Sequence, residues 1–178
     1  VKGDDKTRPD GTIEEADSFV LPFRPNRAQR RVIRRLWHRN LILKARQLGI
    51  TWLVCAYALW LCLHKDQRLV LTFSIGQSEA NEMMRRISAM YHRLPADVRA
   101  ALPPLLKDNT ETMAWANGSR IESLPSRKSA GSGYTASLII LDEFAKNENA
   151  AALYTAVKPT IDGGGSMIIL STANGAGN

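Results

Sequence analysis

The chain has 178 residues, of which 44% are hydrophobic, and it carries a net charge of +7. This length supports one domain with its own core and excludes two large domains. The charge and a pI near 9.7 favour a polyanionic partner, with nucleic acid as the first candidate.

The positive charge is concentrated near the N-terminus. No acidic residue occurs between Asp17 and Asp66, whereas ten lysines and arginines do: Arg24, Arg27, Arg30, Arg31, Arg34, Arg35, Arg39, Lys44, Arg46 and Lys65. Two interpretations stay open for this segment, namely a solvated helix face and a surface that contacts phosphates.

The first elements in chain order follow from composition and spacing. Residues 1–18 are polar and are predicted to be a flexible leader, so that residues 19–178 form the folded domain. Residues 19–25 are expected to be extended because prolines disfavour helix in the residues before them. Asn26 is then the predicted cap of a helix over 27–38.

A short strand at 41–43 and a loop at 44–49 lead into an apolar helix over 50–64. The uncharged run 47–63 resembles a membrane span. It is shorter than the roughly 20 residues that a span needs and includes Gln47 and Gly49, so we predict a helix buried between the sheet and its neighbours. Cys55 and Cys62 lie in this run as buried thiols, and Trp52 and Trp60 are expected to belong to the core.

Further elements alternate along the rest of the chain. We expect a strand at 68–74, an amphipathic helix at 77–93 with its methionines inward, and an irregular connection at 95–118 that includes a hairpin through 113–121. A serine- and glycine-rich loop at 126–133 precedes a strand at 138–141, a helix at 149–158 and a last strand at 167–172. This alternation predicts an α/β fold with a mostly parallel sheet and helices on both faces.

A carboxylate pair follows the most apolar of these strands. Leu138 to Leu141 form a run typical of a strand buried on both faces, and Asp142 and Glu143 come directly after it. Because unpaired acids are costly inside a sheet, the pair is expected at the carboxyl edge, where open α/β sheets bind ligands. One acid can hold magnesium while the next orients a water molecule for phosphoanhydride hydrolysis.

The loop at 44–51, with the sequence KARQLGIT, occupies the place of a phosphate-binding loop. It meets the pattern G-x-x-x-x-G-K-[ST] only in part, because Lys44 replaces the first glycine and Ile50 replaces the lysine, while Gly49 and Thr51 are in register. Backbone N–H groups at the start of the next helix can still hold phosphates. Lys44 and Arg46 can supply the missing positive charge. An ordinary strand-to-helix turn is the alternative.

Together these motifs resemble the ATPase domain of the large terminase subunit of tailed phages, the motor that packages double-stranded DNA into capsids. Residues 23–29 (FRPNRAQ) are similar to the adenine-recognition motif and residues 44–51 to a variant Walker A loop. Residues 138–143 resemble Walker B with its adjoining glutamate, and residues 171–175 (STANG) the coupling motif. The resemblance implies a P-loop NTPase fold of the ASCE type, in which the strand after Walker B lies between it and the P-loop strand.

The resemblance also implies a role for each matching residue. Gln29 would recognise adenine, Lys44 would hold the β- and γ-phosphates, and Arg46 would sense the γ-phosphate. Gln47, Gly49 and Ile50 would complete the ATP-binding loop. Thr51 and Asp142 would bind Mg²⁺, and Glu143 would activate water. Coupling would involve Ser171, Thr172 and Asn174. Arg127 or Lys128 would stand in for the arginine that family members use on a neighbouring subunit's ATP.

The implied partners are double-stranded DNA, further copies in a ring, a portal and a small terminase subunit, in the host cytoplasm and without a membrane. No residues correspond to the family's C-terminal nuclease domain, so we expect a fragment without nuclease activity. Two other functions stay open. One is a helicase-like translocase, against which the missing lysine at position 50 argues. The other is a non-hydrolysing nucleotide- or DNA-binding scaffold, for which Ile50 argues.

Overall fold

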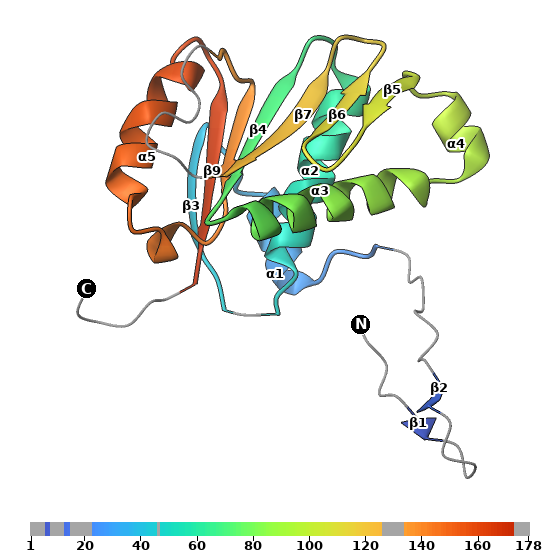
Figure 1. The fold of residues 1–178 in the computed structure, drawn as a ribbon, viewed down its shortest axis with the longest axis horizontal. Coiled ribbons are helices and arrows are strands. Elements are labelled where there is room, and N and C mark those ends of the chain that lie inside the picture. Colours follow the sequence, from blue (N-terminus) through green and yellow to red (C-terminus); the bar gives the residue numbers. More distant parts are fainter. Residues whose placement is uncertain (1–5, 8–12, 15–22, 46, 126–133, 173–178) are drawn as a thin grey trace.

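A seven-stranded sheet forms the centre of the computed structural model, which describes residues 6–7, 13–14, 23–45, 47–125 and 134–172 (Figure 1). In order across the sheet, the strands are β3 (Arg39–Leu43), β9 (Ser166–Ser171), β8 (Leu138–Leu141), β4 (Leu69–Ser74), β7 (Arg120–Pro125), β6 (Thr112–Trp115) and β5 (Leu105–Asp108). The first five strands, from β3 to β7, are parallel to one another. β6 pairs antiparallel with β7, and β5 pairs antiparallel with β6. Two short strands, β1 (Lys6–Thr7) and β2 (Ile13–Glu14), form a separate antiparallel pair.

This architecture confirms the predicted α/β class with a mostly parallel sheet. It also confirms the expected strand order, since β9 pairs with β8 on one side and with β3 on the other. Parallel strands of one sheet end at the same edge, so the residues that follow β3, β8 and β9 are brought together there.

Helices cover both faces of the sheet. On one face α2 (Ile50–His64) and α3 (Gln77–His92) pack against the inward side chains of β4, β7, β8 and β9, and α1 (Arg27–Ile33) adds partly buried side chains beside α2. On the other face α5 (Ala150–Val157) and the 3₁₀ turn η2 (Lys158–Ile161) pack against the alternate side chains of β4 and β8. Figure 1 shows α5 separated from α2 and α3 by the strands.

The apolar run at 47–63 forms α2, with the predicted bounds. Eight of its residues are buried on a helix that is apolar on all sides, which is typical of a helix enclosed by a core. Within the described part of the chain, no helix is long and apolar enough to cross a membrane. Cys55 and Cys62 are buried as expected, and burial raises the pKa of the Cys55 thiol to about 12.

Three expectations were wrong. The segment 95–118 is not irregular throughout, because it contains α4 (Ala96–Ala100), β5 and β6; its predicted hairpin is confirmed by the pairing of Met113 with Ile121. The first helix ends at Ile33 instead of residue 38. Trp52 and Trp60 are 39% and 46% exposed, since they lie on the outer side of α2, where Arg86 covers one ring and His64 stacks on the other.

Candidate nucleotide site

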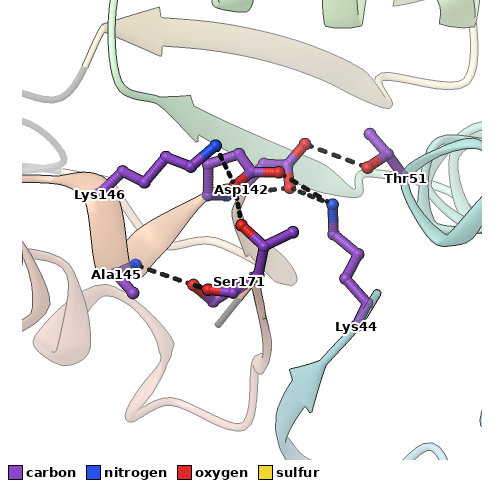
Figure 2. A network of polar contacts seen from close by, with 8 residues as sticks. Lys44, Thr51, Asp142, Ala145, Lys146 and Ser171 are labelled. Carbon is purple, nitrogen blue, oxygen red and sulfur yellow. Dashed lines mark hydrogen bonds and ion pairs between the residues drawn. The ribbon is translucent and has the colours of Figure 1, made fainter. Parts of the chain in front are cut away.

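The predicted site residues meet at the carboxyl edge of the sheet. Lys44 follows β3, Asp142 and Glu143 follow β8, and Thr172 follows β9, while Thr51 lies in the first turn of α2. Figure 2 shows Lys44 and Thr51 pointing toward Asp142 from one side, with Lys146 on the other. Residues far apart in the sequence, such as Lys44 and Ser171, are thus in contact because three parallel strands end side by side.

Lys44 contacts both acids. Its ammonium Nζ lies 3.1 Å from Glu143 Oε1 and 3.6 Å from Asp142 Oδ1, and its side chain is only 10% exposed. The backbone N–H of Lys44 donates to the carbonyl of Ser171 (2.8 Å), which fixes the end of β3 against β9. The lysine at the start of the loop therefore reaches the acidic pair, which places its positive charge within the candidate site.

The loop before α2 has a conformation that favours glycine. Gln47 and Gly49 both have positive φ angles, of 64° and 67°. A Cβ on Gly49 would lie 2.8 Å from Gln29 Nε2, so the loop needs glycine for both backbone and packing reasons. Ile50 is 2% exposed, and its side chain belongs to the core. Position 50 can thus offer a ligand only its backbone N–H, and the first N–H groups of α2 have no partner within the helix.

Thr51 and Asp142 form a pair suited to a magnesium ion. The hydroxyl of Thr51 donates to Asp142 Oδ2 over 3.2 Å, and the backbone N–H of Glu143 donates to Asp142 Oδ1 over 3.0 Å. Hydroxyl and carboxylate oxygens are the hard donors that magnesium prefers, usually alongside substrate phosphates and waters. The two residues thus fit a role as its protein ligands.

Glu143 accepts three hydrogen bonds in a strained backbone conformation. Its φ of 51° is unusual for a residue other than glycine. Thr172 Oγ1 donates to its Oε2 (2.9 Å), Lys146 Nζ lies 3.0 Å from Oε2, and Lys44 holds Oε1. Burial alone would raise the pKa of the Glu143 carboxyl, but the hydrogen bonds from Lys146, Thr172 and Lys44 outweigh it and lower the pKa to about 2. The carboxylate is therefore ionised at neutral pH.

Gln29 lies behind the loop. Its Nε2 donates to the carbonyl of Gly49 (2.8 Å), and its Oε1 accepts from the N–H of Asn26 (2.8 Å). The nitrogen and the oxygen of the side-chain amide therefore both have hydrogen-bond partners within the protein. The side chain is 5% exposed. An adenine ring would have to exchange for one of these bonds, and recognition of adenine by Gln29 stays a prediction.

An open cleft of about 460 Å³ adjoins the acids. It is lined by Thr51, Ser74, Ile75, Ser78, Glu79, Glu82, Met83, Arg86, Asp142 and Glu143. The residues from the end of β4 and from α3 had no motif in the sequence. The contact of Lys146 with Glu143 could not be predicted either, because Lys146 lies on the 3₁₀ turn η1 (Phe144–Lys146), and no motif indicates the path of this turn.

The remaining predicted residues divide into two groups. Ser171 is buried, and its Oγ accepts a hydrogen bond from the N–H of Ala145 (3.0 Å), which links the end of β9 to the turn after Glu143. Arg46, Arg127, Lys128 and Asn174 lie outside the described residues, and their predicted roles stay predictions.

A mostly parallel sheet of this order, with a loop that leads into a helix after one strand and an acidic pair after another, is the arrangement of a P-loop NTPase fold. The family model described as "Terminase large subunit, T4likevirus-type, N-terminal" matches residues 41–177. The chain therefore belongs to the terminase large subunit family, as the motifs predicted. No curated protein matches it.

Solved structures of phage terminases share the fold. The large terminase ATPase domain of Thermus phage P74-26 superposes with a TM-score of 0.74 at 20% identity, covering 87% of this chain and 67% of that one. The large terminase of bacteriophage HK97 gives a TM-score of 0.65 at 14% identity, covering 85% of this chain and 33% of that one. That of a thermophilic bacteriophage in complex with ADP gives 0.54 at 11% identity, covering 79% and 34%.

Proposed function

We propose that this chain is the ATP-hydrolysing motor domain of a phage terminase, which couples hydrolysis to the movement of double-stranded DNA into a capsid. The observation that carries the proposal is the meeting of Lys44, Thr51, Asp142 and Glu143 at one sheet edge, with distances of 3.1 to 3.6 Å between their polar atoms. Phosphoryl transfer requires the groups that these four residues supply, namely a cation, two metal-binding oxygens and a base that orients water.

In the proposed binding step, the triphosphate lies along the loop at 47–51. The free N–H groups at the start of α2 and the positive end of its dipole favour the phosphates. Lys44 leaves the carboxylates and turns to the β- and γ-phosphates, which carry more negative charge. Because Ile50 supplies only its N–H, Lys44 provides the positive charge that an ordinary P-loop places at that position.

Thr51 and Asp142 would hold magnesium, which neutralises phosphate charge when it is bound. Asp142 is fixed for this role by two bonds, from the Thr51 hydroxyl and from the N–H of Glu143. Its own N–H donates to the carbonyl of Phe73 on β4 (3.0 Å), so the backbone under the carboxylate is anchored in the sheet.

Glu143 would orient the attacking water. Its carboxylate is ionised and can accept the water's proton, and Thr172 and Lys146 keep it in place when Lys44 moves to the phosphates. Release of Lys44 also removes one of the bonds that lower the pKa of Glu143, so the carboxylate becomes more basic as the substrate binds.

Thr172 connects this chemistry to the rest of the protein, since it extends β9 and contacts Glu143 directly. The proposal assigns Ser171, Thr172 and Asn174 to coupling, and Arg127 or Lys128 to the ATP of a neighbouring copy. The working form would be a ring around DNA that contacts a portal and a small terminase subunit in the host cytoplasm.

Turnover of ATP with magnesium by wild-type chain, Glu143→Gln and Lys44→Ala tests the proposal. Glu143→Gln should lower kcat by about a hundredfold or more, as expected for loss of a catalytic base, while binding of a fluorescent ATP analogue persists. Lys44→Ala should weaken that binding. The exposed pair Glu148→Gln and Lys65→Ala serve as controls and should behave as wild type.

Two results would contradict the proposal. One is wild-type chain that hydrolyses no ATP even at high protein concentration with double-stranded DNA present, which would favour a non-hydrolysing scaffold. The other is turnover that survives Glu143→Gln unchanged, because another group would then activate the water.

A further inference from the structure

A row of exposed arginines, which we call the arginine stripe, runs along α1 and the turn that follows it: Arg27, Arg30 and Arg31 lie on α1, and Arg34 and Arg35 come directly after its end. These residues recur at the three- and four-residue spacing that places side chains on one face of a helix. All five are exposed, while Ala28, Val32 and Leu36 pack against the core from the opposite face. Arg24 precedes the helix and is exposed as well.

The stripe has no counter-charge within the described part of the chain. No acidic group there lies within ion-pair distance of any stripe residue. Other arginines of the chain differ in this respect: Arg85 and Arg86 pair with Glu82, and Arg120 pairs with Glu122. Like charges on adjacent turns repel one another, so a polyanion at this face would relieve that repulsion.

The N-terminal end of α1 is bonded to the phosphate loop. Gln29 Nε2 donates to the carbonyl of Gly49 and Asn26 Nδ2 to that of Leu48 (3.1 Å). Asn26 and Gln29 also bond each other reciprocally in a capping box at the start of the helix. A shift of α1 would therefore be transmitted directly to the two loop residues that precede α2.

We propose that the arginine stripe binds the phosphate backbone of double-stranded DNA and that α1 transmits this contact to the phosphate loop. The inference rests on the proposed function. The helix is roughly 10 Å long, and duplex DNA presents a charge about every 1.7 Å, so several phosphates lie within reach of the stripe. Guanidinium groups suit phosphates, and contacts to the backbone accept any base sequence, as translocation demands.

Fluorescence anisotropy with a labelled 30-base-pair duplex tests the proposal over a series of salt concentrations. The variant replaces Arg27, Arg31 and Arg34 by glutamine. Its control replaces Arg93, Lys107 and Lys158, which are exposed and unpaired on other described elements, so both lose the same charge. The stripe variant should bind at least about tenfold more weakly, and its slope of log affinity against log salt should fall by about 2 to 3.

Three further results are expected. The control should bind DNA like wild type, lysine replacements at the three stripe positions should retain most of the affinity, and duplexes of different sequence should lose affinity alike. The stripe variant should also lose most of the stimulation of ATP turnover by DNA while its basal turnover persists.

Equal losses in stripe variant and control would overturn the proposal, because net charge alone would then explain binding. So would unchanged DNA binding by the stripe variant, an absence of DNA binding by wild-type chain, or displacement of DNA by polyglutamate at equal charge concentration, which would indicate an acidic protein partner. Basal ATP turnover, which does not depend on the stripe, separates failure of this proposal from failure of the proposed function. Loss of basal turnover in the wild-type chain would count against the proposed function, whereas the DNA-binding results above test the stripe.

Discussion

At the scale of single residues, Lys146 deserves a test of its own because it holds the carboxylate that would orient water. We predict that Lys146→Met lowers kcat about two- to fivefold, the effect expected from loss of a partly exposed ion pair. KM for ATP should stay unchanged because Lys146 contacts Glu143 and not the loop. Steady-state kinetics measures both quantities.

The conservative variant and a distant lysine separate positioning from folding. Lys146→Arg should retain most of kcat, since arginine can also donate to Glu143 Oε2, and Lys158→Met should behave as wild type. A kcat unaffected by Lys146→Met would show that Thr172 alone positions the glutamate.

Gly49 gives a second prediction at this scale. Alanine at position 49 would adopt an unfavourable φ of 67° and its Cβ would displace Gln29. We expect Gly49→Ala to lower the free energy of unfolding by about 1–3 kcal/mol and to weaken ATP binding. Gly163→Ala is the matched control, because no atom lies within 4 Å of a Cβ there. Denaturant unfolding of both variants makes the comparison, and equal stabilities would contradict the packing described.

At the scale of elements, the cap of α1 combines two functions that can be separated. Asn26 accepts from the N–H of Gln29 (2.9 Å) and donates to the carbonyl of Leu48. Asn26→Ala should cost about 1 kcal/mol of stability, whereas Asn26→Ser should keep the cap and most of that stability. Both lack the amide donor and should weaken ATP binding alike. Equal ATP affinity in wild type and both variants would mean that α1 does not hold the loop.

The elements predicted well from the sequence are those with a long, clear pattern. The run 50–64 had no charged residue and was long enough for a helix that packs on the core, and the helix at 77–92 has apolar residues at helical spacing with polar ones between them. The short elements α4 and β5 have five and four residues. Their conformation depends on the pairing of β5 with β6 and on packing, which the local sequence does not specify.

The site divides in the same way. Asp142 and Glu143 could be predicted because they follow a strand with a strong pattern, and Thr51 because it stands at the start of an equally clear apolar helix. The contacts of Lys146 and Thr172 with Glu143 could not, because they depend on the left-handed backbone at Glu143, which no pattern in the sequence indicated. The cleft wall from α3 was likewise set by tertiary packing.

At the scale of the whole molecule, the order of strands in the sheet brings the residues of the candidate site together. Because β9 lies between β3 and β8, Thr172 directly after β9 stands between the lysine that follows one strand and the acids that follow another. The two carboxylate oxygens of Glu143 are thus held by residues from different elements. A nucleotide that draws Lys44 away would therefore change contacts among the ends of β3, β8 and β9 at once.

A crystal structure with a non-hydrolysable ATP analogue and magnesium tests this account most directly. We expect Lys44 Nζ to leave Glu143 and to lie at charged hydrogen-bond distance, roughly 2.7–2.9 Å, from an oxygen of the terminal phosphate. Thr51 and Asp142 should face the metal, and Thr172 should remain on Glu143. A bound triphosphate with Lys44 still on the glutamate, or with its phosphates away from residues 47–51, would contradict it.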